Sequence, residues 1–446
     1  MNLRRNTVYS AAGFALPTLV ILLAYPIVLR HLGEKAMGLY LLASTVSGSL
    51  AFLEFGVSTA TVKLLAEKAA SRGRNGAADV VATSLAFYGG LGAVGLVAFW
   101  FLAPVLAKWS GTGPELEQTA VLVLRIAALQ FVPSYLTGVF ASVFKGLHRF
   151  EYSTLVGSLQ TVLVWGGAVV GVRHLGWGVV GVTALGAAGS LFMCVLSGWL
   201  AFRLGRAQGL DLHRGRPGRA ALRGLLQFGV FMAINGVAGV FMLQVQTWLI
   251  AAMLGASAVT IFSTALQITS KINGLMGTMF EPLMPVAASI AAARTRDGLR
   301  SLRAAYDKAM VLSLVLALAA GATLYAFSPW FIGIWLRSSI DAQVVEVIRI
   351  LCLGLAVNGA TPVPYHLMNG MGRPEINTAF MVAGIVLFYG ILAALWTGGL
   401  SLNRFALAMS STFVLNGIAF LVFAELVVWR KWLATGRDVE AGASTP

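Results

Sequence analysis

The stretch RLGRAQGLDLHRGRPGRAALR, residues 203–223, is the longest polar segment of the chain and lies close to its centre. It contains six arginines and one aspartate, and its glycines and proline favour turns over a continuous helix. Long apolar runs lie on both sides of it. We therefore interpret this stretch as a basic linker between two apolar halves.

The composition of the whole chain indicates a membrane protein. Of its 446 residues, 58% are hydrophobic and only 11% are charged, whereas soluble domains carry about 25% charged residues. A soluble protein of this composition could not cover its surface with polar groups, so soluble enzymes, disordered proteins and secreted disulfide scaffolds are excluded. The 50 glycines suit membrane helices that pack closely. The predicted fold class is all-α and polytopic.

Six apolar runs long enough to cross a bilayer precede the linker, and six follow it. They are residues 9–29, 37–62, 79–103, 118–143, 153–172, 177–201, 225–253, 257–285, 309–335, 345–369, 376–397 and 405–429. We expect twelve transmembrane helices in two pseudo-symmetric six-helix bundles. The expected N-terminal bundle, cytoplasmic linker, C-terminal bundle and cytoplasmic tail are residues 1–202, 203–224, 225–432 and 433–446.

Lysine and arginine are distributed unevenly over the segments between these runs. With a cytoplasmic N-terminus, 23 of them fall on the cytoplasmic side and 6 on the outer side. Membrane proteins concentrate positive charge in their cytoplasmic loops. We therefore expect a multi-pass protein of the bacterial cytoplasmic membrane with both termini in the cytoplasm. The net charge of +15 then faces anionic lipid, and no nucleic-acid partner is expected.

Short sequence matches relate the two halves. LGEKAMGLY (32–40) recurs as LGASAVTIF (254–262), an offset of 222 residues. LRIAAL (124–129) recurs as IRILCL (348–353), at an offset of 224. Ordered matches of this kind indicate an internal repeat. Because each half starts in the cytoplasm, the halves should be related by an axis along the membrane normal, with a substrate cavity between them that opens alternately to each side.

Taken together, the basic start, LGEKAMGLY, LEFGVSTATVKLLAE (53–67) and the turns GLHRFE (146–151) and GMGRPE (370–375) resemble a known superfamily. It is the multidrug/oligosaccharidyl-lipid/polysaccharide (MOP) exporter superfamily, and within it the chain is similar to Wzx-type polysaccharide flippases. The resemblance extends over essentially the whole chain. It implies a MATE-like fold of two six-helix bundles around a central cavity.

The resemblance also implies a function. Such flippases move undecaprenyl-diphosphate-linked oligosaccharide units from the inner to the outer leaflet for surface polysaccharide assembly, by alternating access. Polysaccharide polymerase and chain-length proteins are the implied partners, beside the lipid-linked substrate and the bilayer. The sequence itself contains no phosphate-cradling Gly-Lys loop and no zinc-ligand spacing, so no enzyme activity, cofactor or metal is expected. The expected energy source is then an ion gradient or the gradient of the substrate itself.

Three basic residues inside the predicted spans are candidates for binding the diphosphate. Arg125 and Arg349 occupy equivalent positions of the repeat, about 12 Å from the predicted outer helix ends. Lys271 lies about 21 Å into the eighth run. Two arginines that face a central cavity could hold a diphosphate through forked hydrogen bonds. The competing interpretation is that they snorkel to the interface or pair with an acid, such as Glu346 for Arg349.

Two acidic residues are candidates for ion coupling. Glu54 is predicted to lie deep in the second run, where loss of water favours a protonated carboxyl or a paired one. Glu281 lies near the inner end of the eighth run, at an interfacial depth. The competing interpretation of Glu54 is a structural pair with Lys271 or Lys63.

Two other functions remain open at this stage. A small-molecule or multidrug exporter of the same superfamily would hold cationic drugs in an acidic or aromatic cavity, whereas three candidates here are basic. A membrane-embedded glycosyltransferase or polysaccharide polymerase would carry large external loops for catalysis. The longest predicted external loop, around residues 104–117, is short.

Overall fold

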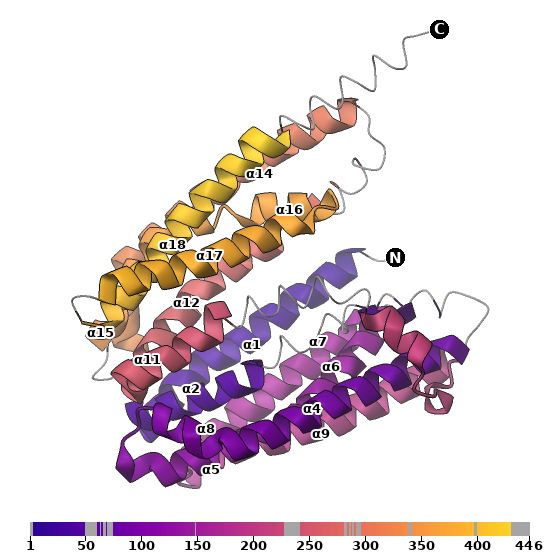
Figure 1. The fold of residues 1–446 in the computed structure, drawn as a ribbon, viewed down its shortest axis with the longest axis horizontal. Coiled ribbons are helices and arrows are strands. Elements are labelled where there is room, and N and C mark those ends of the chain that lie inside the picture. The colour runs from indigo at the N-terminus through magenta and orange to yellow at the C-terminus, as the bar shows by residue number, and fades with distance from the viewer. Residues whose placement is uncertain are drawn as a thin grey trace. The chain divides into compact units, whose positions relative to one another are not determined.

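The structure is a computed structural model that describes most of the chain. The described residues are 3–49, 60–62, 64–65, 68, 75–147, 149–226, 241–280, 283–284, 287, 290, 296–337, 341–396 and 399–429. They form helices joined by short turns, and no strand occurs among them. Figure 1 shows the order of these helices along the chain.

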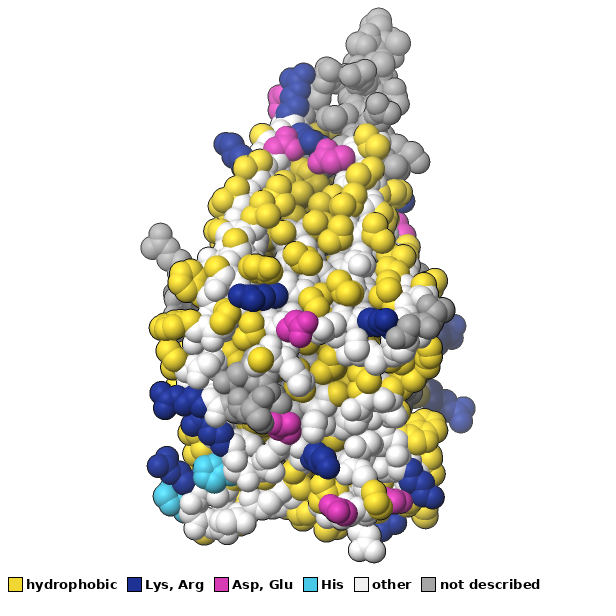
Figure 2. All heavy atoms as spheres, turned by 90° about the vertical axis from the view of Figure 1, so that its left-hand side faces the viewer, with side chains coloured by type: hydrophobic (Ala, Val, Ile, Leu, Met, Phe, Trp, Pro, Cys, Tyr) yellow, Lys and Arg dark blue, Asp and Glu magenta, His cyan; other side chains and the backbone are white. Residues whose placement is uncertain are grey.

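Eight stretches of the described chain are long and apolar enough to cross a membrane. They are Gly76–Trp109, Pro114–Gly146, Glu151–His174, Val179–Ala207, Asp297–Trp335, Ala342–Gly370, Pro374–Leu395 and Leu402–Leu426. A shorter apolar helix covers Leu16–Leu32. Hydrophobic side chains make up much of the face in Figure 2, as expected of helices that contact hydrocarbon.

The chain forms two compact units, Met1–Thr260 and Ile261–Pro446. The first unit contains α1 (Leu3–Leu32), α2 (Glu34–Ser49), α4 (Asn75–Trp109), α5 (Glu117–Ala128), α6 (Phe131–Gly146), α7 (Phe150–Thr161), α8 (Gly167–His174), α9 (Val179–Ala207) and α11 (Gln246–Leu254), together with the start of α12 (Ala256–Phe280). A π-helical turn, Val162–Gly166, joins α7 to α8 and makes them one span. Helix α4 packs against α5 and α6, and α1 packs against α7.

The basic stretch that follows α9 is docked onto the first unit. Leu210 and Leu212 are buried in the same apolar core as Phe144 of α6. The backbone N–H of Arg216 donates to the Asp79 carboxylate of α4 at 2.8 Å. The backbone N–H of Gly218 donates to the Thr83 hydroxyl at 3.1 Å. Part of the predicted linker is therefore fixed to the start of α4 by hydrogen bonds and buried leucines.

The second unit contains the rest of α12, together with α14 (Arg296–Trp335), α15 (Asp341–Asn358), α16 (Pro362–Gly370), α17 (Pro374–Leu395) and α18 (Leu402–Phe423). Prolines at the first positions of α16 and α17 suit helix starts, because those backbone positions have no intrahelical N–H bond to lose. Helix α15 packs between α14 and α18. A buried apolar cluster that includes Phe280, Tyr306, Leu367 and Phe420 forms the core.

The repeat predicted from the sequence corresponds to repeated local structure. Gly33 and Gly255, 222 residues apart, both adopt positive φ in the turn between two helices, at +77° and +89°. In the GLHRFE turn, Arg149 pairs with Glu151 at 2.8 Å. In the GMGRPE turn, the equivalent Arg373 pairs with Glu375 at 3.0 Å. The matched segments therefore form the same turns with the same contacts.

The compact units divide the chain at a different place from the predicted bundles. Residues Phe241–Thr260 belong to the first unit, because the π turn Phe241–Val245 and α11 contact α2, and α11 also contacts α4. The predicted division at residues 203–224 follows the repeat and the membrane topology, and it stays a prediction.

Candidate functional site

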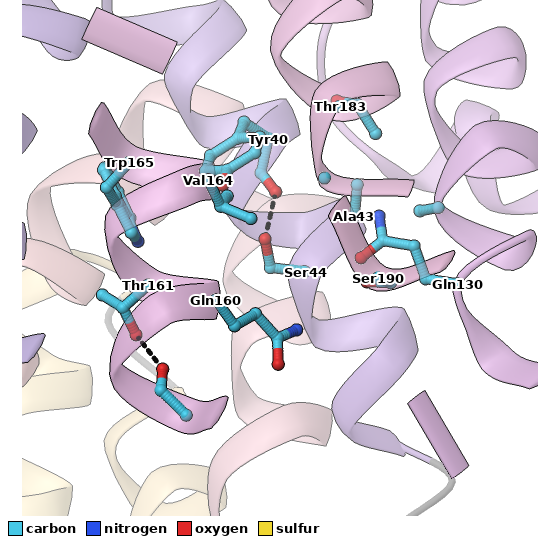
Figure 3. A pocket seen from close by; sticks show the side chains of 13 residues that line it. Tyr40, Ala43, Ser44, Gln130, Gln160, Thr161, Val164, Trp165, Thr183 and Ser190 are labelled. Carbon is cyan, nitrogen blue, oxygen red and sulfur yellow. Dashed lines mark hydrogen bonds between the residues drawn. The ribbon is translucent and has the colours of Figure 1, made fainter. Parts of the chain in front are cut away.

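A cavity of about 230 Å³ lies inside the first unit, among helices α2, α5, α7 and α9 and the π turn after α7 (Figure 3). Its lining residues are Tyr40, Ala43, Ser44, Ala127, Gln130, Gly157, Gln160, Thr161, Val164, Trp165, Thr183, Gly186 and Ser190. None of these residues carries a charge. The polar groups that face the cavity are amides, hydroxyls and an indole.

Helical periodicity brings these residues to one place. On α9, Thr183, Gly186 and Ser190 recur at spacings of three and four residues and share one face. Gly157, Gln160 and Val164 do the same along α7 and the π turn. A side chain at Gly157 would enter open space, so glycine at this position contributes to the free volume. A π turn in the lining is notable because such turns occur often at functional sites.

Three hydroxyl groups of the cavity already donate hydrogen bonds to backbone carbonyls of their own helices. Ser44 donates to the carbonyl of Tyr40 at 2.9 Å, and Thr161 donates to that of Gly157 at 3.1 Å. Thr183 donates to the carbonyl of Val179 at 2.8 Å. Each hydroxyl oxygen keeps lone pairs that can accept a hydrogen bond from a ligand.

The two glutamines supply the complementary donors. Gln130 and Gln160 reach into the cavity from opposite sides in Figure 3. Neither amide is hydrogen-bonded to another residue in the part of the chain that the structure describes. Each amide offers two N–H donors and one carbonyl acceptor. The cavity therefore presents neutral donors and acceptors together, which suits a ligand rich in hydroxyl groups.

An aromatic group closes one side of the cavity. The Trp165 ring lies 6.0 Å from the Tyr40 ring, edge to face, and 6.0 Å from the Tyr25 ring of α1. Tyr25 is buried and precedes Pro26, one of two prolines inside α1. Proline removes a hydrogen bond from the helix and allows it to bend. Trp165 thus connects the cavity to a helix that contains bend points.

Arg125 does not line this cavity, although it lies on α5 two residues before Ala127, which does. Two residues correspond to about 200° of rotation around an α-helix, so Arg125 lies on the opposite face. Its guanidinium lies over the Trp100 ring of α4, 5.2 Å from the ring centroid. The predicted arginine site and the neutral cavity are therefore separate features of the first unit.

In the second unit, Arg349 lies over the Tyr325 ring of α14, also at 5.2 Å, and its Nε donates to the Tyr325 carbonyl at 3.4 Å. Glu346, the expected partner of Arg349, instead accepts a hydrogen bond from Asn403 at 2.6 Å. Lys271 is exposed on α12.

The two candidates for ion coupling, Glu54 and Glu281, lie outside the described residues. Sequence reasoning missed Gln130, Gln160 and Trp165, because it searched for charge inside the membrane. The signal that could have found part of the site is the helical spacing of small and polar residues at positions 157, 160, 161 and 183, 186, 190.

An ion pair in the second unit was also missed. Arg303 of α14 contacts Asp307 at 2.9 Å and Glu425 at 2.7 Å, and Glu425 lies in the π-helical turn Ala424–Trp429 that follows α18. The guanidinium also lies over the buried Tyr306 ring at 5.5 Å. These contacts tie the start of α14 to the turn that follows α18.

Comparisons with known proteins place this geometry in context. Residues 3–291 match the family described as "Polysaccharide biosynthesis protein". The "Putative O-antigen transporter" of Shigella flexneri is 18% identical over 395 residues, which cover 88% of this chain and 90% of that protein.

Solved structures show the same fold at low sequence identity. A multidrug resistance MATE family transporter of the MOP superfamily, in its inward-facing conformation, superposes with a TM-score of 0.82 at 18% identity, over 96% of this chain and 99% of that one. A MOP superfamily transporter from Pyrococcus furiosus superposes with a TM-score of 0.70 at 18% identity, over 97% and 95%. The predicted all-α, MATE-like membrane fold is thereby confirmed.

Proposed function

Because the chain belongs to the polysaccharide biosynthesis protein family, we propose that it is a flippase for an undecaprenyl-diphosphate-linked oligosaccharide. It moves the lipid-linked sugar across the bacterial cytoplasmic membrane for assembly of a surface polysaccharide. Both termini lie in the cytoplasm, and polysaccharide polymerase and chain-length proteins act on the exported unit. The observation that carries this proposal is the uncharged cavity around Gln130 and Gln160.

The lining of the cavity suits sugar chemistry. A sugar hydroxyl both donates and accepts hydrogen bonds, and the cavity offers amide donors beside hydroxyl oxygens that accept. The Trp165 ring supplies an apolar surface with a polar N–H at its edge. The volume of about 230 Å³ is below the roughly 300–1,000 Å³ of sites for drug-sized ligands. The cavity therefore fits part of a headgroup, with the rest of the oligosaccharide outside it.

The same lining disfavours export of cationic drugs. A buried cation requires a carboxylate or several aromatic faces around it. Among the described residues, no acidic side chain lines the cavity, and the aromatic rings of its lining are Trp165 and Tyr40. The function of a polymerase or glycosyltransferase is disfavoured as well, because the curated relative and the superposed structures are described as transporters.

The charged part of the substrate needs cations, and the described lining of the cavity supplies none. Arg125, Arg349 and Lys271 stay the proposed ligands of the diphosphate, since each is basic and lies within a predicted span. Their place outside the neutral cavity implies that the sugar and the diphosphate are bound by different parts of the protein. A large amphiphilic substrate allows this separation.

Transport by alternating access requires a contact that can close on the outer side. In the first unit, Thr260 of α12 donates to the Glu34 carbonyl at 2.8 Å, and the N–H of Ala256 donates to the Gly111 carbonyl at 3.4 Å. Gly38 faces the Ala256 carbonyl so closely that a Cβ would overlap it. We assign this glycine-lined contact, at the predicted outer ends of α2, α4, α11 and α12, to closure of the transport path.

Ion coupling is proposed for Glu54 and Glu281. Changing Glu54→Gln keeps the shape of the side chain and removes its charge. We expect export to lose its dependence on external pH, because protonation of a carboxyl can no longer accompany transport. Export should be measured between pH 5.5 and 8 in cells of matched protein abundance. An unaltered rate and pH profile would exclude this residue from coupling.

The cavity is tested by replacing its amides. Gln130→Leu and Gln160→Leu keep approximate volume and remove every donor and acceptor, so we expect little export from the double variant. The measurement is leaflet-resolved accumulation of lipid-linked sugar, together with surface polysaccharide, in a strain that lacks its own flippase. Gln118→Leu, at an exposed position near the start of α5, is the matched control and should export normally. Normal export from the double variant at normal abundance would contradict the proposal.

A further inference from the structure

The two units share one side-chain arrangement at equivalent positions of the repeat. Arg125 lies eight residues after Glu117, the first residue of α5, and Arg349 lies eight residues after Asp341, the first residue of α15. Each guanidinium lies over an aromatic ring of the preceding helix, at the same distance of 5.2 Å, with Trp100 in one unit and Tyr325 in the other. The repeat therefore preserves a cation on a ring, even though the ring itself differs.

Neither arginine is neutralised by a carboxylate among the described residues. The Nε atom of Arg125 is buried and has no hydrogen-bond partner there. The Nε atom of Arg349 donates to a backbone carbonyl at 3.4 Å, and the nearby Glu346 is bound by Asn403. A cation at this depth in a membrane is costly unless it is paired, and stacking on a ring recovers only part of that cost. The arrangement lacks an anion.

The surroundings of both rings are exposed and apolar. In the most apolar 18-residue segment of α4, only 22% of the residues are buried, and in that of α14 the share is 17%. Trp100 is 39% exposed, beside the exposed Val97 and Phe101. Tyr325 is 47% exposed, beside the exposed Phe327. Helix faces of this kind contact hydrocarbon chains.

We propose that Arg125 with Trp100, and Arg349 with Tyr325, form two equivalent sites for the phosphate group of a membrane lipid. The lipid chain lies on the apolar face of α4 or α14, and the phosphate accepts hydrogen bonds from the edge of the guanidinium. The ring holds the guanidinium plane, so its forked donors are oriented before the lipid arrives. At about 12 Å from the start of the helix, the arginine lies below the membrane surface and draws the headgroup inward.

These sites differ from the neutral cavity, which Arg125 does not line, and they extend to lipid phosphates in general the diphosphate-binding role proposed above for Arg125 and Arg349. The same phosphate chemistry occurs in bulk anionic phospholipid and in a polyprenyl diphosphate carrier. Lipid binding can therefore be measured without sugar, and its failure is separable from failure of the flippase proposal.

The test is native mass spectrometry of the purified, delipidated full chain, titrated with dioleoylphosphatidic acid, undecaprenyl diphosphate or the phosphate-free dioleoylglycerol. We expect two phosphate lipids to bind the wild-type chain above the level of dioleoylglycerol. Arg125→Ala and Arg349→Ala should each lose one site, with binding weakened about tenfold or more, as for loss of a charge-assisted hydrogen bond. The double variant should lose both sites.

The control is Arg173→Ala, which removes an exposed arginine at the end of α8 and should keep both sites. Trp100→Leu and Tyr325→Leu keep both arginines and should weaken lipid binding less than the alanine variants do. These two variants test the proposal if the alanine variants do not fold. If the arginine variants lose only the binding of undecaprenyl diphosphate, the sites are specific for the carrier lipid. If they lose the binding of phosphatidic acid to the same extent, the sites accept any lipid phosphate. Unchanged binding by the double variant, or equal binding of dioleoylglycerol to the wild-type chain, would overturn the proposal.

Discussion

At the scale of single residues, the candidate site depends on neutral groups. Gln130 and Gln160 bring unused amides to a cavity in which three hydroxyl groups already donate to their own helices. The basic residues lie elsewhere, and Arg125 is on the face of α5 opposite the cavity. A neutral site binds hydroxyl groups without the large desolvation cost of a buried charge.

A single carboxylate also anchors the basic stretch after α9. Asp79→Ala removes the acceptor of the Arg216 N–H, a hydrogen bond to a charged group that contributes on the order of 1 kcal/mol at an exposed site. We expect trypsin to cleave the chain after Arg214 or Arg219 several times faster; Arg216 precedes Pro217 and is not a trypsin site. The rate should be followed by gel electrophoresis in detergent. Asp297→Ala, which removes an exposed acid on α14, should leave this rate unchanged; equal acceleration by both variants would refute the anchor.

At the scale of helices, glycines decide how closely neighbours approach. Gly38 and Gly111 lie against the backbone at Ala251, Gly255 and Ala256, where a methyl group would overlap existing atoms. Gly111 also has a positive φ of +63°, which residues other than glycine adopt only with strain. Small residues at such contacts are the usual means of close packing between membrane helices.

We predict that Gly38→Ala separates the start of α2 from α12 and destabilises the first unit by about 1–3 kcal/mol, the usual cost of overpacking. A thermal unfolding scan in detergent measures this as a lower midpoint. Gly90→Ala is the matched control, since its added methyl group would enter open space on α4. If both variants unfold at the wild-type temperature, the close contact does not contribute to stability.

At the scale of the whole molecule, function requires a fixed direction across the membrane. The distribution of 23 and 6 basic residues predicts a cytoplasmic side that includes the docked stretch after α9. The turn between α4 and α5 is then outside. The division into the units Met1–Thr260 and Ile261–Pro446 does not by itself fix this direction.

Labelling with a membrane-impermeant maleimide tests the topology. Glu115→Cys and Gln208→Cys place thiols at exposed positions at opposite ends of the helices. We expect Glu115→Cys to react in intact spheroplasts and Gln208→Cys to react only after permeabilisation. The wild-type chain is the control, because Cys352 is buried and Cys194 is half-buried. The reverse pattern of labelling would invert the topology.

The sequence by itself determined the class of the protein, its membrane-spanning character and the equivalence of Arg125 and Arg349. These properties depend on hydrophobicity, loop charge and sequence repeats. Each of these is read directly from the order of residues, without knowing which distant segments are in contact. The matching turns at Gly33 and Gly255 follow from the same local information, because a positive φ at glycine depends on adjacent residues.

Tertiary structure alone decided where the functional side chains meet. The cavity combines residues from α2, α5, α7 and α9, and polar residues that pack between helices cannot be distinguished in sequence from those that line a space. The arginines were found in sequence, but their rings, Trp100 and Tyr325, lie on other helices. The composition of the polar stretch after α9 predicts a linker, whereas hydrogen bonds to Asp79 and Thr83 of α4 fix it to the first unit. In each case, the contact joins segments that only the packing of helices brings together.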